Sequence, residues 1–163
     1  FTMYPKARRV VQGSVNVLKQ SKNAKIADKG KLAIIKKGKF AGYVVFTLTL
    51  EERATCPRDC YHWDNCYGNN MAFAHRFQHG GELENKLEQE VQELCATYKG
   101  VIIRLHVLGD FYSVQYVRLW HKLMSLYDNL AVWGYTGRKP DSDIGKSILY
   151  NNHRFGSRWS VRF

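Results

Sequence analysis

Residues 101–111, VIIRLHVLGDF, contain the apolar run Val101 to Leu108, which ends in the polar turn Gly109-Asp110. A short run that is rich in β-branched residues and bounded by glycines is typical of a strand buried in a sheet. Segments in which apolar residues recur at helical spacing lie on both sides of it. A buried strand between two amphipathic helices predicts an α/β fold with a parallel sheet.

Two amphipathic helices are predicted next to this strand. The first spans residues 82–98 and is followed by Gly100, and the second runs from a capping Ser113 to about Tyr127. Their expected inner faces consist of Leu83, Leu87, Val91, Leu94, Cys95 and Tyr98 in the first, and Val114, Val117, Leu123, Met124 and Leu126 in the second. We therefore expect Cys95 to be a core residue.

Three further strands are predicted at residues 43–50 (YVVFTLTL), 130–135 (LAVWGY) and 158–163 (RWSVRF), with a short helix at 144–150. Strands and helices then alternate along the chain, which indicates a parallel sheet with right-handed crossovers. Four such units form either an open α/β sheet or half of an eight-stranded barrel, a partial TIM-like barrel. We expect this α/β domain to span residues 43–163 and to follow a basic, irregular N-terminal arm, residues 1–42.

The positive charge of the chain is concentrated in that arm. The formal net charge is +11, and residues 1–42 hold eleven Lys or Arg against one acidic residue. A basic arm before a nearly neutral domain predicts a nucleic acid partner, because lysine and arginine near phosphates release condensed counterions. The candidate contacts are Arg8, Arg9, Lys36, Lys37 and Lys39. The alternative is an arm that only keeps the protein in solution.

No apolar run approaches the roughly 18 to 20 residues that span a bilayer, and the N-terminal sequence lacks the pattern of a secretory signal. We expect a soluble, cytoplasmic protein with no membrane partner.

Three of the four cysteines lie in TCPRDCYHWDNCYGN, residues 55–69. The spacing of Cys56, Cys60 and Cys66 allows three thiolates of one loop to bind a 4Fe-4S cluster or, alternatively, zinc. Such crowding in a reducing compartment favours a metal over a disulfide framework, and the polar loop argues against buried free thiols. A fourth ligand could be Cys95, His62, His75 or His79.

Polar residues follow the predicted strands, and the carboxyl ends of parallel strands share one edge of a sheet. We expect the cysteine loop, the segment from His106 to Asp110 and the segment from Trp133 to Arg138 to meet there. Arg104 and His106 alternate onto one face of their strand, which makes them catalytic candidates with Asp110. The alternatives are packing under helices for the first two residues and a turn or cap for Asp110. His121 and His153 are expected on the surface.

The segments TCP, RLHVLGDFYS, AVWGYTGR and NNHRFGSRWSVRF make the chain similar to the phage and mobile-element Gene product 88 family, over residues 43–163. The arrangement more distantly resembles radical S-adenosylmethionine enzymes, which would imply a radical-SAM-like partial barrel. That resemblance implies a cluster on Cys56, Cys60 and Cys66. It further implies that S-adenosylmethionine binds at Gly109, Asp110, Thr136 and Gly137.

The sequence thus predicts a phage-type iron–sulfur protein, a possible radical S-adenosylmethionine-like enzyme, that binds or modifies nucleic acid in the host cytoplasm. One alternative is a non-enzymatic, metal-stapled nucleic-acid-binding module. Another, by similarity to tRNA-guanine transglycosylases, is a base-exchange enzyme with Asp110 as nucleophile and structural zinc.

Overall fold

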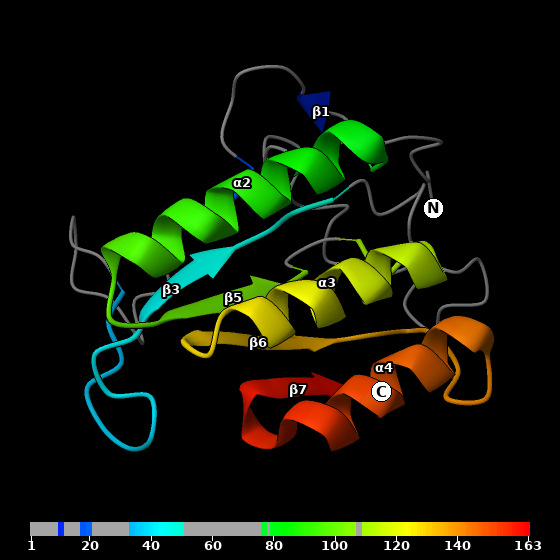
Figure 1. The fold of residues 1–163 in the computed structure, drawn as a ribbon. Coiled ribbons are helices and arrows are strands. Elements are labelled where there is room, and N and C mark those ends of the chain that lie inside the picture. Colours follow the sequence, from blue (N-terminus) through cyan, green and yellow to red (C-terminus); the bar gives the residue numbers. More distant parts are fainter. Residues whose placement is uncertain (1–9, 12–16, 21–32, 51–75, 78, 107–108) are drawn as a thin grey trace, which may run out of the picture.

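The computed structural model describes residues 10–11, 17–20, 33–50, 76–77, 79–106 and 109–163. Its centre is a five-stranded sheet in the order β2-β3-β5-β6-β7 (Figure 1). These strands are β2 (Lys19–Gln20), β3 (Val44–Thr47), β5 (Val101–Leu105), β6 (Leu130–Tyr135) and β7 (Trp159–Arg162). The last four are parallel, and β2 is antiparallel to β3. A separate parallel pair joins β1 (Val10–Val11) to β4 (Arg76–Phe77).

Three α-helices of the described part of the chain cover one face of the sheet (Figure 1). They are α2 (Gly81–Thr97), α3 (Val114–Leu126) and α4 (Asp143–Phe155), and the 3-10 helix η2 (Gly156–Arg158) precedes β7. The parallel strands lie side by side in chain order, so right-handed crossovers put every helix on the same side. The predicted α/β class is confirmed, while the described sheet is open and does not close into a barrel.

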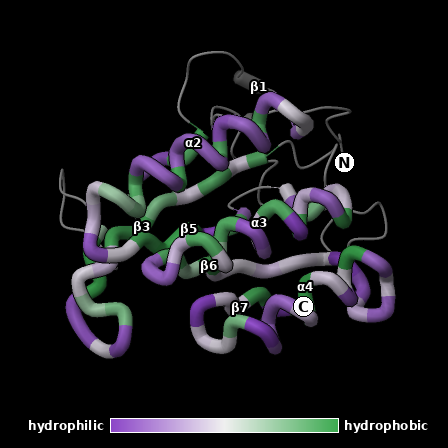
Figure 2. The backbone as a smooth tube through the Cα atoms, in the orientation of Figure 1, coloured by the Kyte–Doolittle hydropathy of each residue, from purple (hydrophilic) through white to green (hydrophobic). Residues whose placement is uncertain are grey.

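The main core lies between the sheet and the helices. Figure 2 shows hydrophobic residues along β3 and β5 and alternating hydrophobic and hydrophilic residues along the helices. A smaller cluster on the opposite face contains Ala33, Val45, Ile102 and Ala131. Residues 33–43 cover it: Ile35 N donates to Tyr43 O (2.9 Å), and the Phe40 ring packs edge-on against Trp133. We call this segment the 33–43 hairpin.

The helix predictions are largely confirmed. Ser113 caps α3, its side chain accepting a hydrogen bond from Tyr116 N (3.1 Å). The prediction that Leu126 faces inward is wrong, because Leu126 is 59% exposed. Tyr116 and Trp120, four residues apart, fill the inner face instead, and Leu126 lies at the margin of that stripe. The last helix is longer than predicted and ends where Gly156 adopts φ 59°.

The described parts of the first 42 residues contact the domain. Val17 and Leu18 are buried, and their N–H groups each donate to the carboxylate of Glu90 on α2 (both 3.0 Å). β2 follows directly and completes the edge of the sheet. The expected division into residues 1–42 and 43–163 stays a prediction. No helix within the described ranges is both long and apolar enough to span a bilayer.

Candidate functional site

Two of the three predicted strand-end segments meet at the carboxyl edge of the sheet. β5 ends at Leu105 and leads to Asp110, while β6 ends at Tyr135 and leads to Thr136. The Thr136 N–H donates to Arg162 O of β7 (2.8 Å), which fixes the second segment to its neighbour. The third, the cysteine segment, follows β3 through residues 48–50 but lies outside the described residues.

Asp110 joins the two segments. Its Oδ1 accepts hydrogen bonds from Phe111 N (2.7 Å) and Thr136 Oγ1 (2.6 Å), and its Oδ2 accepts one from Gly137 N (2.7 Å). The carboxylate is only 3% exposed. Gly109 has φ 90°, a conformation that glycine adopts without strain and that lets the chain turn into this position. We call this arrangement the Asp110 clasp.

The electrostatics of the clasp are those of a buried carboxylate. Burial raises the pKa of Asp110, and the hydrogen bonds from Thr136, Gly137 and Phe111 and the charge of Arg138 oppose that rise. Arg138 Nε also donates to Phe111 O (2.8 Å). Because three donors occupy the carboxylate, the clasp is better suited to hold two loops together than to attack a substrate. The same hydrogen bonds make neighbours of the four predicted cofactor residues, Gly109, Asp110, Thr136 and Gly137.

His106 points toward the helices, which the strand pattern does not predict. Its Nε2 lies 2.7 Å from Tyr116 Oη of α3, and its ring packs edge-on against Phe111 (centroids 4.9 Å apart). Arg104 is exposed on the opposite face, in register with Thr47 and Trp133. The prediction that Arg104 and His106 share a face is therefore wrong, because β5 ends at Leu105 and its alternation does not extend to His106.

The imidazole of His106 is neutral. Burial lowers its pKa to about 3, and burial keeps the pKa of Tyr116 well above its usual value. The tautomer of the ring decides whether Tyr116 Oη or His106 Nε2 donates the hydrogen bond between them. Nδ1 is buried and has no hydrogen-bond partner among the residues that the structure describes. The carboxyl edge thus holds one buried ring nitrogen that no described residue contacts by a hydrogen bond.

The predicted metal ligands Cys56, Cys60 and Cys66 lie outside the described residues, as do His62 and His75. Within the described ranges, no group of three or more His, Cys, Asp or Glu side chains could hold a metal ion. Cys95 is buried in the core as predicted, and burial raises its pKa to about 11.

Cys95 and His79 lie toward opposite ends of α2. The Cys95 carbonyl accepts a hydrogen bond from Asn129 Nδ2 (2.9 Å), next to the start of β6 and hence at the amino edge of the sheet. His79 precedes α2, with its ring centroid 4.9 Å from that of Tyr112, close to the clasp. Of these two fourth-ligand candidates, only His79 lies near the edge to which β3 leads.

Three of the five predicted nucleic-acid residues are described, and these three are not part of this edge. Arg8 and Arg9 lie outside the described residues, whereas Lys36 and Lys37 are exposed in the turn of the 33–43 hairpin. Lys39 Nζ donates to Ser157 Oγ (2.8 Å), just before β7. Lys36, Lys37 and Lys39 therefore lie at the amino edge, separated from the Asp110 clasp by the length of the strands.

The sequence alone does not indicate roles for Tyr116 and Arg138 at this edge. The spacing of Tyr116 to Trp120 on a capped helix is a signal for the first, since it places both rings on the face that covers the sheet. No comparable signal marks Arg138, because its contact with Phe111 O depends on the approach of two loops.

Comparison with known proteins gives one family. The model of the family described as Gene product 88 matches residues 16–142, which include the cysteine segment and both halves of the Asp110 clasp. The match begins earlier than the expected residue 43 and ends before α4, so residues 143–163 lie beyond it. No curated protein and no solved structure matches, and the resemblance to radical S-adenosylmethionine enzymes gains no support. The chain belongs to the Gene product 88 family.

Proposed function

We propose that the protein is an iron–sulfur protein in which Cys56, Cys60 and Cys66 hold a 4Fe-4S cluster at the carboxyl edge of the sheet. The observation that carries this proposal is the course of β3. After β3 ends at Thr47, the chain continues through the buried Leu48 and Leu50, and Leu48 N donates to Arg104 O (3.3 Å). The segment with the cysteines thus starts from the edge that holds His106 and the Asp110 clasp.

The donor set and the described surroundings fit such a cluster. Three thiolates suit iron–sulfur clusters, and an apolar, aromatic environment limits the access of water. The rings of Phe111, Tyr112 and Tyr116 gather at this edge, with Tyr112 and Tyr116 stacked at 4.5 Å. His79 beside Tyr112 is the candidate for a fourth ligand. When bound, the cluster would supply one-electron transfer.

A nucleic acid is the partner that we propose for the basic surface. The net charge of +11 and the exposed Lys36 and Lys37 support it. These lysines lie at the amino edge, so their contacts with phosphates would position a strand without touching the cluster edge.

The Asp110 clasp argues against a base-exchange reaction. A nucleophilic carboxylate needs an oxygen that the substrate can reach, and Asp110 is 3% exposed with hydrogen bonds from both loops to its two oxygens. We therefore give Asp110 a structural role. We also propose that the domain is related to half of an eight-stranded barrel. The four parallel strands in chain order, with all described helices on one face of the sheet, support this relationship.

The cluster proposal is tested by two matched cysteine variants purified without oxygen. Cys60→Ala should lose the visible absorption of the cluster, whereas Cys95→Ala should keep it, because Cys95 lies in the core at the opposite edge. An unchanged visible spectrum in Cys60→Ala would overturn the proposal. If the wild-type chain contained zinc and no iron, the alternative of a non-enzymatic, metal-stapled module would replace the iron–sulfur proposal.

A further inference from the structure

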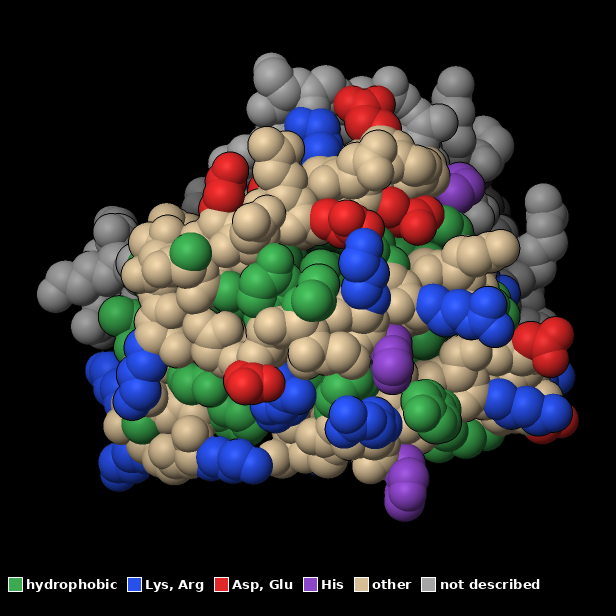
Figure 3. Space-filling view, in the orientation of Figure 1, with side chains coloured by type: hydrophobic (Ala, Val, Ile, Leu, Met, Phe, Trp, Pro, Cys, Tyr) green, Lys and Arg blue, Asp and Glu red, His purple; other side chains and the backbone are tan. Residues whose placement is uncertain are grey.

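The helix layer has an uneven distribution of charge. α2 carries five glutamates and one lysine, whereas α3 and α4 together carry four Lys or Arg and one acidic residue. In Figure 3 the acidic side chains gather over α2, and basic side chains and histidines gather over α3 and α4. The surface formed by α3 and α4 therefore attracts anions.

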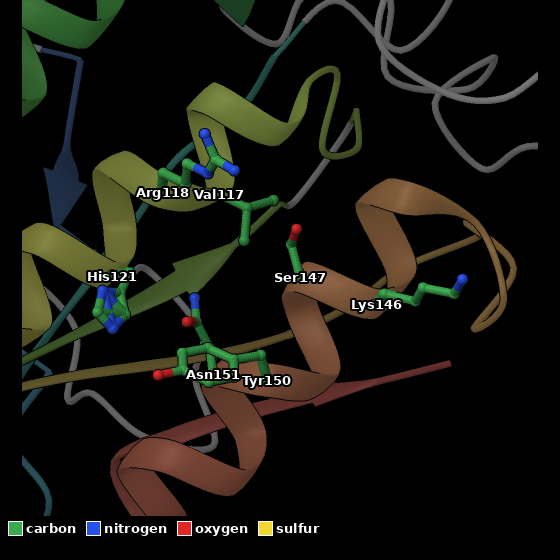
Figure 4. Close-up of a pocket in the computed structure, with 7 residues that line it drawn as sticks. All are labelled: Val117, Arg118, His121, Lys146, Ser147, Tyr150 and Asn151. Carbon is green, nitrogen blue, oxygen red and sulfur yellow. The ribbon is translucent and has the colours of Figure 1, made fainter.

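A groove of about 560 Å³ lies between these two helices. This volume is within the range of about 300 to 1,000 Å³ that small-molecule sites occupy. Figure 4 shows Ser147 and Asn151 pointing from α4 toward α3, and His121 pointing from α3 toward α4. None of the lining residues is acidic: they are Val117, Arg118, His121, Lys146, Ser147, Tyr150 and Asn151.

Two polar atoms of the groove are buried without a hydrogen-bond partner in the described part of the chain. They are Nδ2 of Asn151, a residue that is 1% exposed, and Nε2 of His121. An unpaired buried donor costs about 1 to 3 kcal/mol, so native proteins rarely keep one without a partner. Because Asn151 Nδ2 can only donate, the missing partner must be an acceptor. Burial and then Arg154 lower the pKa of His121, which favours its neutral form.

The rim of the groove supplies two unpaired cations and an aromatic ring. Arg118 and Lys146 are exposed, and their side chains make no ion pair or hydrogen bond with the described residues. Lys122 on the same surface differs, because its Nζ lies 3.3 Å from Glu88 Oε1. Tyr150 is 59% exposed, and its ring centroid lies 5.7 Å from that of His121. Cations beside an exposed aromatic ring are the combination that binds a phosphate and stacks a base.

We propose that the groove between α3 and α4 binds a phosphate group of a nucleotide. Arg118 and Lys146 would pair with its charge, Asn151 would donate to it, and Tyr150 would stack against the base. A phosphate presents three anionic oxygens, so each of the two cations and the amide can contact a different oxygen. The groove is lined by helix residues only, away from the clasp and the 33–43 hairpin. The inference therefore does not rest on the proposed function.

The test titrates the full chain with AMP, inorganic phosphate and a single-stranded oligonucleotide, with affinities measured by calorimetry. Arg118→Gln and Lys146→Gln should each weaken binding by about tenfold, the effect of one charged hydrogen bond. Lys122→Gln removes the same charge from α3 outside the groove and should leave the affinity within about twofold. Tyr150→Ala should weaken AMP and leave inorganic phosphate unchanged.

The two possible sources of the phosphate give different results. AMP binding with this variant pattern assigns the groove to a free nucleotide, whereas the same pattern with the oligonucleotide alone assigns it to a nucleic-acid strand. The proposal is overturned if neither AMP nor the oligonucleotide binds. It is also overturned if Lys122→Gln weakens binding as much as Arg118→Gln does.

Discussion

At the scale of single residues, the carboxyl edge is defined by two buried polar side chains with different roles. Asp110 accepts three hydrogen bonds and joins two loops, while His106 has one nitrogen hydrogen-bonded to Tyr116 and one without a partner among the described residues. A buried polar group that is satisfied stabilises a structure, and one that is not satisfied marks a place where a ligand can bind.

His106 should make the stability of the protein dependent on pH. Its pKa is about 3 in the folded chain and near 6.5 when unfolded, so its contribution is complete above about pH 6.5 and lost as pH falls. Between about pH 7 and pH 5 the free energy of unfolding should drop by about 2 kcal/mol from this residue. Denaturant unfolding at both pH values would show this drop reduced in His106→Gln and retained in His153→Gln, which changes an exposed histidine. Equal drops in the wild type and His106→Gln would refute the assignment.

Asp110→Asn should weaken the clasp. The amide oxygen can still accept, but the new NH₂ group would face a donor, at a cost of about 1 to 3 kcal/mol in the free energy of unfolding. The matched change Asp128→Asn alters an exposed residue and should cost less than about 0.5 kcal/mol. Urea unfolding of both variants measures the difference. The clasp would not be structural if the two variants were equally stable.

At the scale of elements, the sequence predicts most of what the structure contains, because strands and amphipathic helices leave strong periodic signals. The range of β6 and the Ser113 cap are confirmed. The packing of the 33–43 hairpin and of residues 17–20 is not predicted, since short segments rich in lysine and glycine have no clear period. Their positions depend on tertiary contacts, of which the Glu90 carboxylate on α2 is the clearest.

Glu90→Ala should release residues 17–20 from α2. It removes the acceptor of the Val17 and Leu18 N–H groups, so the amide exchange of both should become faster and the free energy of unfolding should fall by about 1 to 3 kcal/mol. Glu93→Ala changes an exposed glutamate of the same helix and serves as the control. Unchanged exchange at Val17 and Leu18 in Glu90→Ala would show that β2 is held by other contacts.

At the scale of the whole molecule, the sheet separates three candidate surfaces. The clasp and His106 lie at the carboxyl edge, the exposed Lys36 and Lys37 at the amino edge, and the α3–α4 groove on the helix layer. Strand order predicts that loops meet at one edge, and the clasp shows two of them doing so. The groove could not be predicted, because Asn151 and His121 acquire their shared surroundings only when two helices pack.

We propose above all that Cys56, Cys60 and Cys66 hold a cluster. Quantifying iron, acid-labile sulfide and zinc in the wild-type chain, purified without oxygen, tests this most directly. We expect about four irons and four sulfides per chain, as a 4Fe-4S cluster requires. A chain that contains neither iron nor sulfide would contradict it.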